Sequence, residues 1–335
     1  MAPMETETSA SAPITPQFKD RRTGLIVFGI LEILLGGFCV LLMLLMLVAP
    51  MMAGAAGAPR GQFKMLLPAV AIYGLLAAGL IALGSGSILC RRWARALSLV
   101  LAWSWLVMGA VGLVLYALFL PKMLGTVGGP HPLPETARLV ITVVALIFMA
   151  LVFVALPGSL VLFYGSRQVK ATCEARDPVP RWTDACPLPV LAMSLWLWFA
   201  VPMFVMMPVA YHGVAPFFGT FLTGVPGGLF YLFMAVIWAW AAWRLYRLDV
   251  RAWWVLLVAL VLFSVSGLLT YAHHDIVEMY RLMGYPEAQI EQIQKSGLLA
   301  GNHMAWLTGC SMVPFLGYLL FVKKYLRTNL QPLLK

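Results

Sequence analysis

Charged side chains are scarce in this sequence. Only 11% of its 335 residues are Asp, Glu, Lys or Arg, whereas 62% are hydrophobic. A soluble domain carries about 25% charged residues. This shortage excludes a water-soluble globule, because so much apolar surface has to face lipid.

The apolar residues are gathered in eight runs, each close to the roughly 20 residues that a helix needs to cross a bilayer. The runs cover 24–49, 65–89, 96–120, 138–165, 188–210, 224–245, 252–272 and 304–322. They lack the alternation of a membrane barrel strand, and lipid offers no partner to an unpaired peptide group. The sequence therefore predicts an all-α fold, a polytopic transmembrane helix bundle with eight spans.

Lys and Arg are distributed unevenly between the two sides of the predicted bundle. Of the 23, 17 fall in the two tails and three short loops on one side, and 6 fall on the other. Short loops rich in Lys and Arg stay in the cytoplasm. We therefore expect both termini to be cytoplasmic, and a bacterial cytoplasmic membrane is the default location.

The basic residues are spread over five segments, each beside the end of a run. This pattern suits anionic lipid headgroups, whereas a nucleic-acid patch would be concentrated on one element. Lipid is therefore the expected partner, and nucleic acid is not. The arginines assigned to headgroups are Arg91, Arg92, Arg95, Arg247 and Arg251.

Cysteine is also rare. Cys39 and Cys310 lie inside runs, and Cys90, Cys173 and Cys186 fall on the cytoplasmic side, where thiols stay reduced. We expect no disulfide. Cys173 and Cys186 have no close CxxC partner, which argues against a zinc site there.

The chain divides into two sets of four runs. Residues 1–22 are a polar tail expected to be disordered, and residues 171–186 form a cytoplasmic linker between units 23–170 and 187–335. Arg91 and Arg95 align with Arg247 and Arg251 at an offset of 156 residues. Four spans per unit would make the repeat parallel. The alternative is that any multi-pass protein has arginines at its inner helix ends.

Glu32 is the only acid inside a predicted span. An ionised carboxylate at that depth is costly, so such a residue is protonated, paired or turned to a cavity. One interpretation is proton or ion coupling. The other is a neutral acid hydrogen-bonded across helices or near Ser85 and Ser87. The aligned residue of the second unit is Trp198, so the repeat does not duplicate the acid.

All five histidines are predicted on the outer side. His273 and His274 end one run and His303 begins the next, so these side chains are expected to lie near each other. Imidazole and carboxylate groups together bind zinc or copper, or pass protons. The tentative metal ligands are His273, His274, His303, Asp275 and Glu278. The alternative is that histidines and acids favour the wet interface, and no other cofactor is predicted.

The outer segment 275–302 carries apolar residues at intervals of three and four, interrupted by Gly284 and Pro286. This pattern predicts two short amphipathic helices that lie on the membrane or cap the bundle. Capping, or binding of a protein subunit, is the expected role of this segment.

No enzyme motif fits the predicted topology. GSGS (84–87) would need a histidine base for serine chemistry, and every histidine is predicted at the opposite side of the membrane. The favoured hypothesis is a non-catalytic membrane component, either a subunit or a scaffold of a complex. The alternatives are a small-molecule or proton-coupled transporter that uses Glu32, and an outward-facing metal or redox site at His273, His274 and His303.

Overall fold

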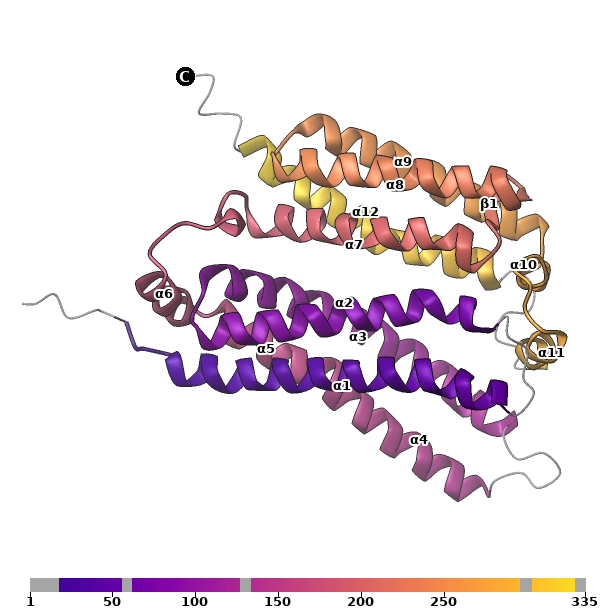
Figure 1. Ribbon diagram of the computed structural model, residues 1–335, viewed down its shortest axis with the longest axis horizontal. Helices are drawn as coiled ribbons and strands as arrows, with labels where there is room; N and C mark the ends of the chain where they lie inside the picture. Colours follow the sequence, from indigo (N-terminus) through magenta and orange to yellow (C-terminus); the bar gives the residue numbers. More distant parts are fainter. Residues whose placement is uncertain (1–17, 56–61, 127–133, 296–302, 329–335) are drawn as a thin grey trace, which may run out of the picture.

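The computed structural model describes residues 18–55, 62–126, 134–295 and 303–328, and the side chains of some residues within its helices are not described. The first half of the bundle contains α1 (Arg22–Ala55), α2 (Gln62–Ile88), α3 (Arg92–Thr126), α4 (Glu135–Ala150), the π-helical segment η1 (Leu151–Ala155) and α5 (Leu156–Gly165). The second half contains α7 (Leu188–Ala210), α8 (Gly224–Tyr246), α9 (Val250–His273) and α12 (His303–Thr328). Figure 1 shows these long helices running side by side.

The chain is an all-α membrane bundle, apart from one small hairpin. Seven stretches among the described residues are long and apolar enough to cross a membrane. They lie in α1, α2, α3, the continuous α4–η1–α5 segment, α7, α8 and α9. The eighth predicted run, 304–322, falls within α12, where several side chains lie outside the described part of the chain.

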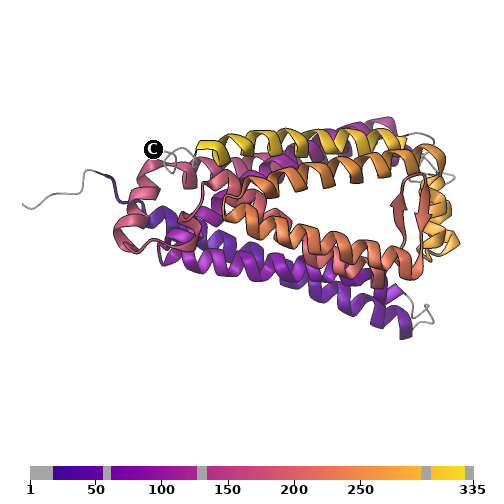
Figure 2. The same cartoon turned by 90° about the horizontal axis from the view of Figure 1, so that it is seen from above.

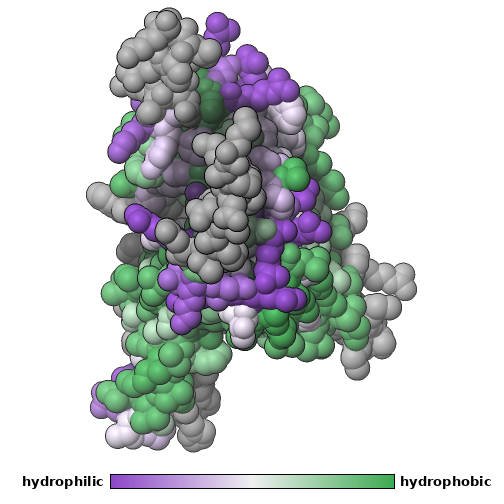
Figure 3. Space-filling view, turned by 90° about the vertical axis from the view of Figure 1, so that its left-hand side faces the viewer, coloured by the Kyte–Doolittle hydropathy of each residue, from purple (hydrophilic) through white to green (hydrophobic). Residues whose placement is uncertain are grey.

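Helix α1 begins and α12 ends at the same end of the bundle (Figure 1), which we call the basic end. The short helices α6 (Arg167–Arg176) and η2 (Trp182–Asp184) also lie there. Figure 3 views this end, where hydrophilic side chains gather while hydrophobic ones cover the flanks. The opposite end, which we call the hairpin end, carries α10 (Ile276–Leu282), α11 (Glu287–Lys295) and the strands (Figure 2).

The predicted linker 171–186 contains helical segments. It overlaps α6 and η2, which pack against α3. Of the tail predicted to be disordered, residues 1–17 lie outside the described residues. Asp20 contacts α6 through an ion pair with Arg176, in which the carboxyl oxygen and guanidinium nitrogen are 3.0 Å apart.

The two halves turn in the same way at the basic end. Three residues join α2 to α3 (89–91) and three join α8 to α9 (247–249), and the middle residue of each is left-handed, with φ +54° at Cys90 and +61° at Leu248. The hydrogen bonds also match, because Cys90 and Leu248 each donate to the carbonyl three residues earlier. Leu248 follows Cys90 by 158 residues, so the turns align two residues away from the offset of 156 inferred from the arginines.

Pro157 shapes the helix that contains α4. A proline has no N–H for the carbonyl four residues earlier, and its ring crowds that carbonyl. The carbonyl concerned belongs to Phe153, in the middle of η1. It instead faces Gly109 of α3, at a spacing that leaves no room for a Cβ. The structure accordingly contains a π-helical turn immediately before Pro157.

The hairpin end carries a β-hairpin that the sequence analysis did not predict. Strands β1 (Ala215–Phe217) and β2 (Thr220–Leu222) pair antiparallel around Phe218 and Gly219. Both turn residues have positive φ, +41° and +92°, which favours a tight two-residue turn. Two hydroxyls of α9 hold this turn, because Ser266 and Thr270 accept hydrogen bonds from the Phe218 and Gly219 amides at 2.9 and 3.1 Å.

Candidate functional site

Glu32 lies inside the first half, about 15 Å along α1 from Arg22 at 1.5 Å per residue. Its side chain is buried, with 2% of the residue exposed. The Ser87 hydroxyl on α2 donates to Glu32 Oε2 at 3.3 Å, and the Tyr164 hydroxyl on α5 donates to Ser87 Oγ at 2.9 Å. Two hydroxyls from different helices therefore form a chain that ends on the carboxyl group.

Ser98 of α3 completes this cluster, and we call Glu32, Ser87, Ser98 and Tyr164 the polar quartet. The Ser98 hydroxyl lies toward the Glu32 carboxyl. It is buried and faces the carboxyl group and the Tyr164 hydroxyl, but its contacts fall outside good hydrogen-bond geometry in the described part of the chain. A buried hydroxyl that is not fully satisfied is unfavourable, so this oxygen is free to take up a further ligand.

Close packing of helices brings the quartet together. Gly29 of α1 and Gly84 of α2 lie back to back, so that a Cβ on Gly29 would sit 2.7 Å from the Gly84 carbonyl oxygen. Small residues permit such an approach between membrane helices. Glu32 follows Gly29 by about one turn and Ser87 follows Gly84 by three residues, so the two polar side chains meet just beyond the contact.

Aromatic rings line the quartet. The rings of Phe28 and Phe163 are 4.4 Å apart, and Phe163 lies edge-on to Tyr164 with a centroid distance of 5.3 Å. No Lys or Arg forms an ion pair with Glu32 in the part of the chain that the structure describes. The carboxyl is therefore surrounded by hydroxyls and aromatic rings, and the described protein supplies no compensating charge.

The matching positions of the second half are apolar. The offset of the two turns, 158 residues, relates Ser87, Ser98 and Tyr164 to Leu245, Leu256 and Val322.

The contact between the first two helices of each half also aligns. Ser194 of α7 donates to the Ala242 carbonyl of α8 at 2.8 Å, and Ala242 follows Gly84 by the same 158 residues. Ser194 therefore takes the place of Gly29, and Leu197 takes that of Glu32, one residue away from the predicted Trp198. Leu197, Leu245, Leu256 and Val322 are all buried in one hydrophobic core.

Among the histidines predicted on the outer side, His274 connects two elements of the hairpin end. His274 Nδ1 is 2.8 Å from Glu278 Oε2, and Nε2 is 3.0 Å from the Gly219 carbonyl oxygen. A carbonyl oxygen only accepts, so Nε2 is the donor in that contact, while Nδ1 lies within hydrogen-bond distance of the carboxyl group. His274 thus links the hairpin tip to α10, with both of its ring nitrogens engaged.

The neighbours of His274 have separate partners. His273 Nδ1 lies 2.8 Å from the Leu269 carbonyl of its own helix. The Asp275 carboxyl accepts from the Val277 amide and caps α10. Within the described residues no three His, Cys, Asp or Glu side chains are grouped to hold a metal. The side chain of His303 lies outside those residues, so the metal site stays a prediction.

Several of the basic-end arginines have protein partners. Arg91 and Arg92 approach Asp177 and Glu174, at 3.9 and 3.2 Å. Arg181 holds Asp177 at 2.8 Å, and this hydrogen bond lowers the pKa of the Asp177 carboxyl. These contacts hold α6 and the residue that follows it against the start of α3.

The other arginines assigned to headgroups have different surroundings. Arg95 is partly buried, and its Nε has no hydrogen-bond partner in the described residues. Arg247 stacks over Trp243 with 4.7 Å between its Cζ and the ring centroid, and the side chain of Arg251 is exposed. Headgroup binding by these arginines stays a prediction.

The two linker thiols are shielded. Burial raises the pKa of Cys173 to about 12 and that of Cys186 to about 11. Thiols with such pKa values are protonated at neutral pH, and the thiolate is the form that acts as nucleophile and metal ligand. Cys173 and Cys186 therefore fit a structural role.

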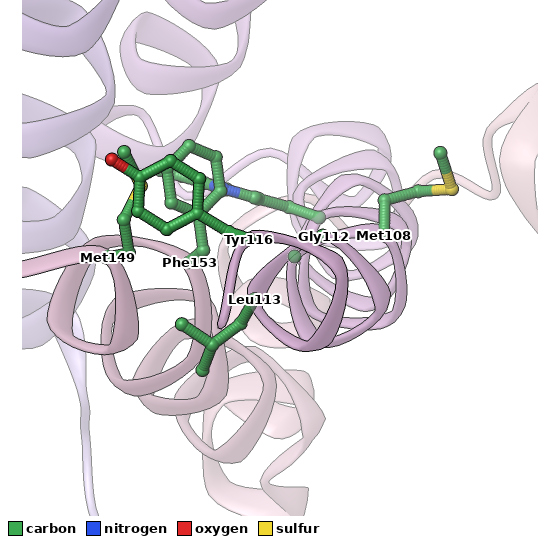
Figure 4. Close-up of a pocket in the computed structure, with 8 residues that line it drawn as sticks. Met108, Gly112, Leu113, Tyr116, Met149 and Phe153 are labelled. Carbon is green, nitrogen blue, oxygen red and sulfur yellow. The ribbon is translucent and has the colours of Figure 1, made fainter. Parts of the chain in front are cut away.

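A hollow lies between α3 and the α4–η1 helix (Figure 4), with a volume of about 240 Å³. Its walls are almost wholly apolar, and they include Trp105, Tyr116, Met149 and Phe153. The gap separates helices that touch closely at Gly109 and Phe153 and then diverge toward the hairpin end. Because of this gap, part of α4 does not pack against α3.

No match was found to a known protein family, to a curated protein or to a solved structure. The functional assignment therefore depends on the geometry of this chain. Sequence reasoning identified Glu32 and the neighbouring Ser87. It missed Ser98 and Tyr164, because their inward orientation depends on how α3 and α5 are rotated about their axes.

Proposed function

We propose that the protein is a non-catalytic component of a membrane assembly and that α4 is its main surface for a partner helix. The observation that carries this proposal is the exposure of α4. In the most apolar window of the span Glu135–Gly165 no residue is buried, whereas the other spans have between 11% and 33% of theirs buried.

The position of α4 explains this exposure. It diverges from the bundle in Figure 1 and contacts α3 and η1. Its outward side chains include Leu139, Val144 and Ile147, each more than half exposed. Helices associate in lipid through close packing of side chains, and a diverging apolar helix offers two open flanks for such packing.

The outer segment 275–302 is less suited to hold a subunit. Ile276, Val277 and Ile290 are buried against each other, with Met279 and Tyr280 around them. The apolar faces of α10 and α11 are thus directed toward one another. We therefore favour α4 over the outer segment as the surface for a protein partner.

The proposal includes the topology inferred from charge. It has eight spans, with α12 as the last, and the basic end in the cytoplasm of a bacterial cell. Support comes from the clustering of basic side chains at the end where α1 begins and α12 ends, since Lys and Arg favour the cytoplasmic side. A duplication of the four-helix unit is supported by the matching turns at Cys90 and Leu248.

A photo-crosslinking residue placed on α4 tests the proposal. Val144, which is 61% exposed, is compared with Val236 of α8, which is 66% exposed. We expect a discrete protein adduct from Val144 in intact membranes, and lipid adducts alone from Val236. Equal protein adducts from both positions, or none from Val144, would reject α4 as an interface.

The polar quartet favours a second candidate function, a proton- or cation-coupled transporter. An ionisable residue in a span marks a candidate functional site, and Glu32 is surrounded by hydroxyls rather than by a counter-charge. If coupling runs through Glu32, Glu32→Gln abolishes the ion dependence of uptake in reconstituted vesicles. Unchanged ion dependence would remove this candidate and leave the assembly role untouched.

A further inference from the structure

The polar quartet presents oxygen atoms from four helices to one buried point. They are the carboxyl oxygens of Glu32 and the hydroxyl oxygens of Ser87, Ser98 and Tyr164. All four residues are at most 2% exposed. The cluster contains one acidic group and no basic one, so an ionised Glu32 would leave a single negative charge without a protein partner.

We propose that the quartet binds one monovalent alkali cation of the size of Na⁺. Hard cations prefer oxygen ligands, whereas transition metals favour nitrogen and sulfur. One carboxylate neutralises one positive charge, and a divalent ion would leave a net charge buried in lipid. This proposal deepens the second candidate function by naming the ion, and it depends on that function only for its link to transport.

The hydrogen bonds leave a ligand for such an ion. Tyr164 donates to Ser87, and Ser87 donates to Glu32 Oε2. That chain orients two hydroxyls, while the buried Ser98 hydroxyl faces the same carboxyl group without good hydrogen-bond geometry in the described structure. A cation held between Ser98 and the carboxylate would satisfy this oxygen and the charge together.

The second half shows that packing alone does not require polar groups at this place. Leu197, Leu245, Leu256 and Val322 fill the matching positions without a polar atom in their side chains. A carboxyl group buried without a counter-charge is unfavourable. The polar set in the first half is therefore best explained by what it binds.

Access to the quartet is shortest from the basic end. Ser87 is the penultimate residue of α2, and Tyr164 is the penultimate residue of α5. The three-residue turn 89–91 begins two residues after Ser87. An ion would thus pass a short turn and the Phe28 and Phe163 rings, rather than most of the membrane thickness.

The first test is equilibrium binding of radiolabelled Na⁺ to the full chain purified in mild detergent. We expect about one bound ion per chain, displaced by excess NaCl and not by choline chloride. A ligand that binds only the folded protein raises its melting temperature with concentration. The melting temperature should therefore rise with NaCl, at constant ionic strength set with choline chloride.

Variants locate the bound ion. Glu32→Gln should lose the Na⁺-dependent shift, and Ser98→Ala should weaken Na⁺ binding several-fold. Glu135→Gln and Ser159→Ala are matched controls, because these residues are exposed and lie outside the quartet, and both should bind as wild type does. If Glu32→Gln does not fold, the comparison of Ser98→Ala with Ser159→Ala decides.

Three results would overturn the proposal: no Na⁺ bound by the folded wild type, equal Na⁺ shifts in wild type and Glu32→Gln, or equal binding by Ser98→Ala and Ser159→Ala. A wild-type melting temperature that follows pH but not Na⁺ would identify the occupant as a proton. That outcome rejects the cation site and leaves proton coupling through Glu32 standing, so the two failures are distinguishable.

Discussion

In the first half of the bundle α1 and α2 meet through Gly29 and Gly84, whereas in the second half α7 and α8 meet through Ser194 and Ala242. The turns that follow α2 and α8 are alike in length, backbone conformation and hydrogen bonding. The cores beside these turns differ, since one holds Glu32 and hydroxyls and the other holds leucine and valine.

The comparison distinguishes what the four-helix fold requires from a polar core that only the first half contains. An apolar core beside the turn is sufficient, as the second half shows. The polar core of the first half buries a carboxyl group, which is unfavourable unless its charge is neutralised. Variants that make one half resemble the other should therefore have unequal effects.

The largest effect should come from placing an acid in the second half. Leu197→Glu buries a carboxyl group among leucines, and the nearest hydroxyl along α7, Ser194, already donates to the Ala242 carbonyl. An acid at the centre of a membrane helix costs about 3 kcal/mol, so we expect a comparable loss of stability in thermal melts of the purified protein. The volume-conserving variant Leu197→Met should cost less than about 1.5 kcal/mol. Similar losses for both variants would mean that the two cores are equally tolerant of charge.

The glycine contact should be the next most sensitive feature. A Cβ at residue 84 would collide with the Gly29 carbonyl and lie 2.7 Å from Ile33 Cγ1. Overpacking of this kind costs about 1–3 kcal/mol, so Gly84→Ala should lower the melting temperature and disturb the quartet. The reverse change at the matching place, Ala242→Gly, should cost only about 0.5–1 kcal/mol. A neutral Gly84→Ala would show that α1 and α2 are free to separate.

A smaller effect is expected from single hydroxyl groups. Tyr164→Phe removes the hydrogen bond to Ser87, and Tyr231→Phe removes one to the Val214 carbonyl in the second half. Each should cost about 1 kcal/mol. Only Tyr164→Phe should also alter the Na⁺ response of the melting temperature. A change of that response in Tyr231→Phe would point to a general effect of tyrosine loss.

The smallest effect concerns acid pH and the basic end of the first half. Its hydrogen bond to Arg181 lowers the pKa of Asp177. The stabilisation is complete above the ordinary Asp pKa of about 3.9 and is lost as the pH falls through the lowered folded value. Protease cleavage within 171–186 should therefore accelerate only below about pH 4.

A matched pair of variants checks this assignment. Asp177→Asn should give fast cleavage at neutral pH, because it removes the charge that Arg91 and Arg181 hold. Asp184→Asn alters an acid of the same segment that is 41% exposed and should change cleavage less. Equal cleavage in both variants would assign the acid sensitivity to the segment as a whole.

Run length and composition were sufficient to predict the seven spans found among the described residues, because a helix in lipid satisfies its own backbone. They were insufficient for the hairpin, because Phe218–Gly219 is not one of the dipeptides typical of a two-residue turn.

The site was harder to predict than the fold. A lone acid in a span is visible in a sequence, so Glu32 was identified. The inward faces of α3 and α5 are not visible, because residues all round these helices are apolar, and Ser98 and Tyr164 were missed for this reason. In the structure the two halves are aligned by their helix contacts, Gly29 with Gly84 in the first half and Ser194 with Ala242 in the second. This alignment places Leu197, and not Trp198, at the position that corresponds to Glu32.

The π-helical segment Leu151–Ala155 has a consequence for how such a chain changes over generations. A π-turn accommodates one residue more than an α-turn, so it is equivalent to a single-residue insertion. Removing that residue would rotate Glu135–Ala150 by about 100° relative to α5, while Tyr164 kept its place beside Ser87. One codon gained or lost would therefore re-aim the outer helix toward a different neighbour and leave the buried carboxyl group unchanged.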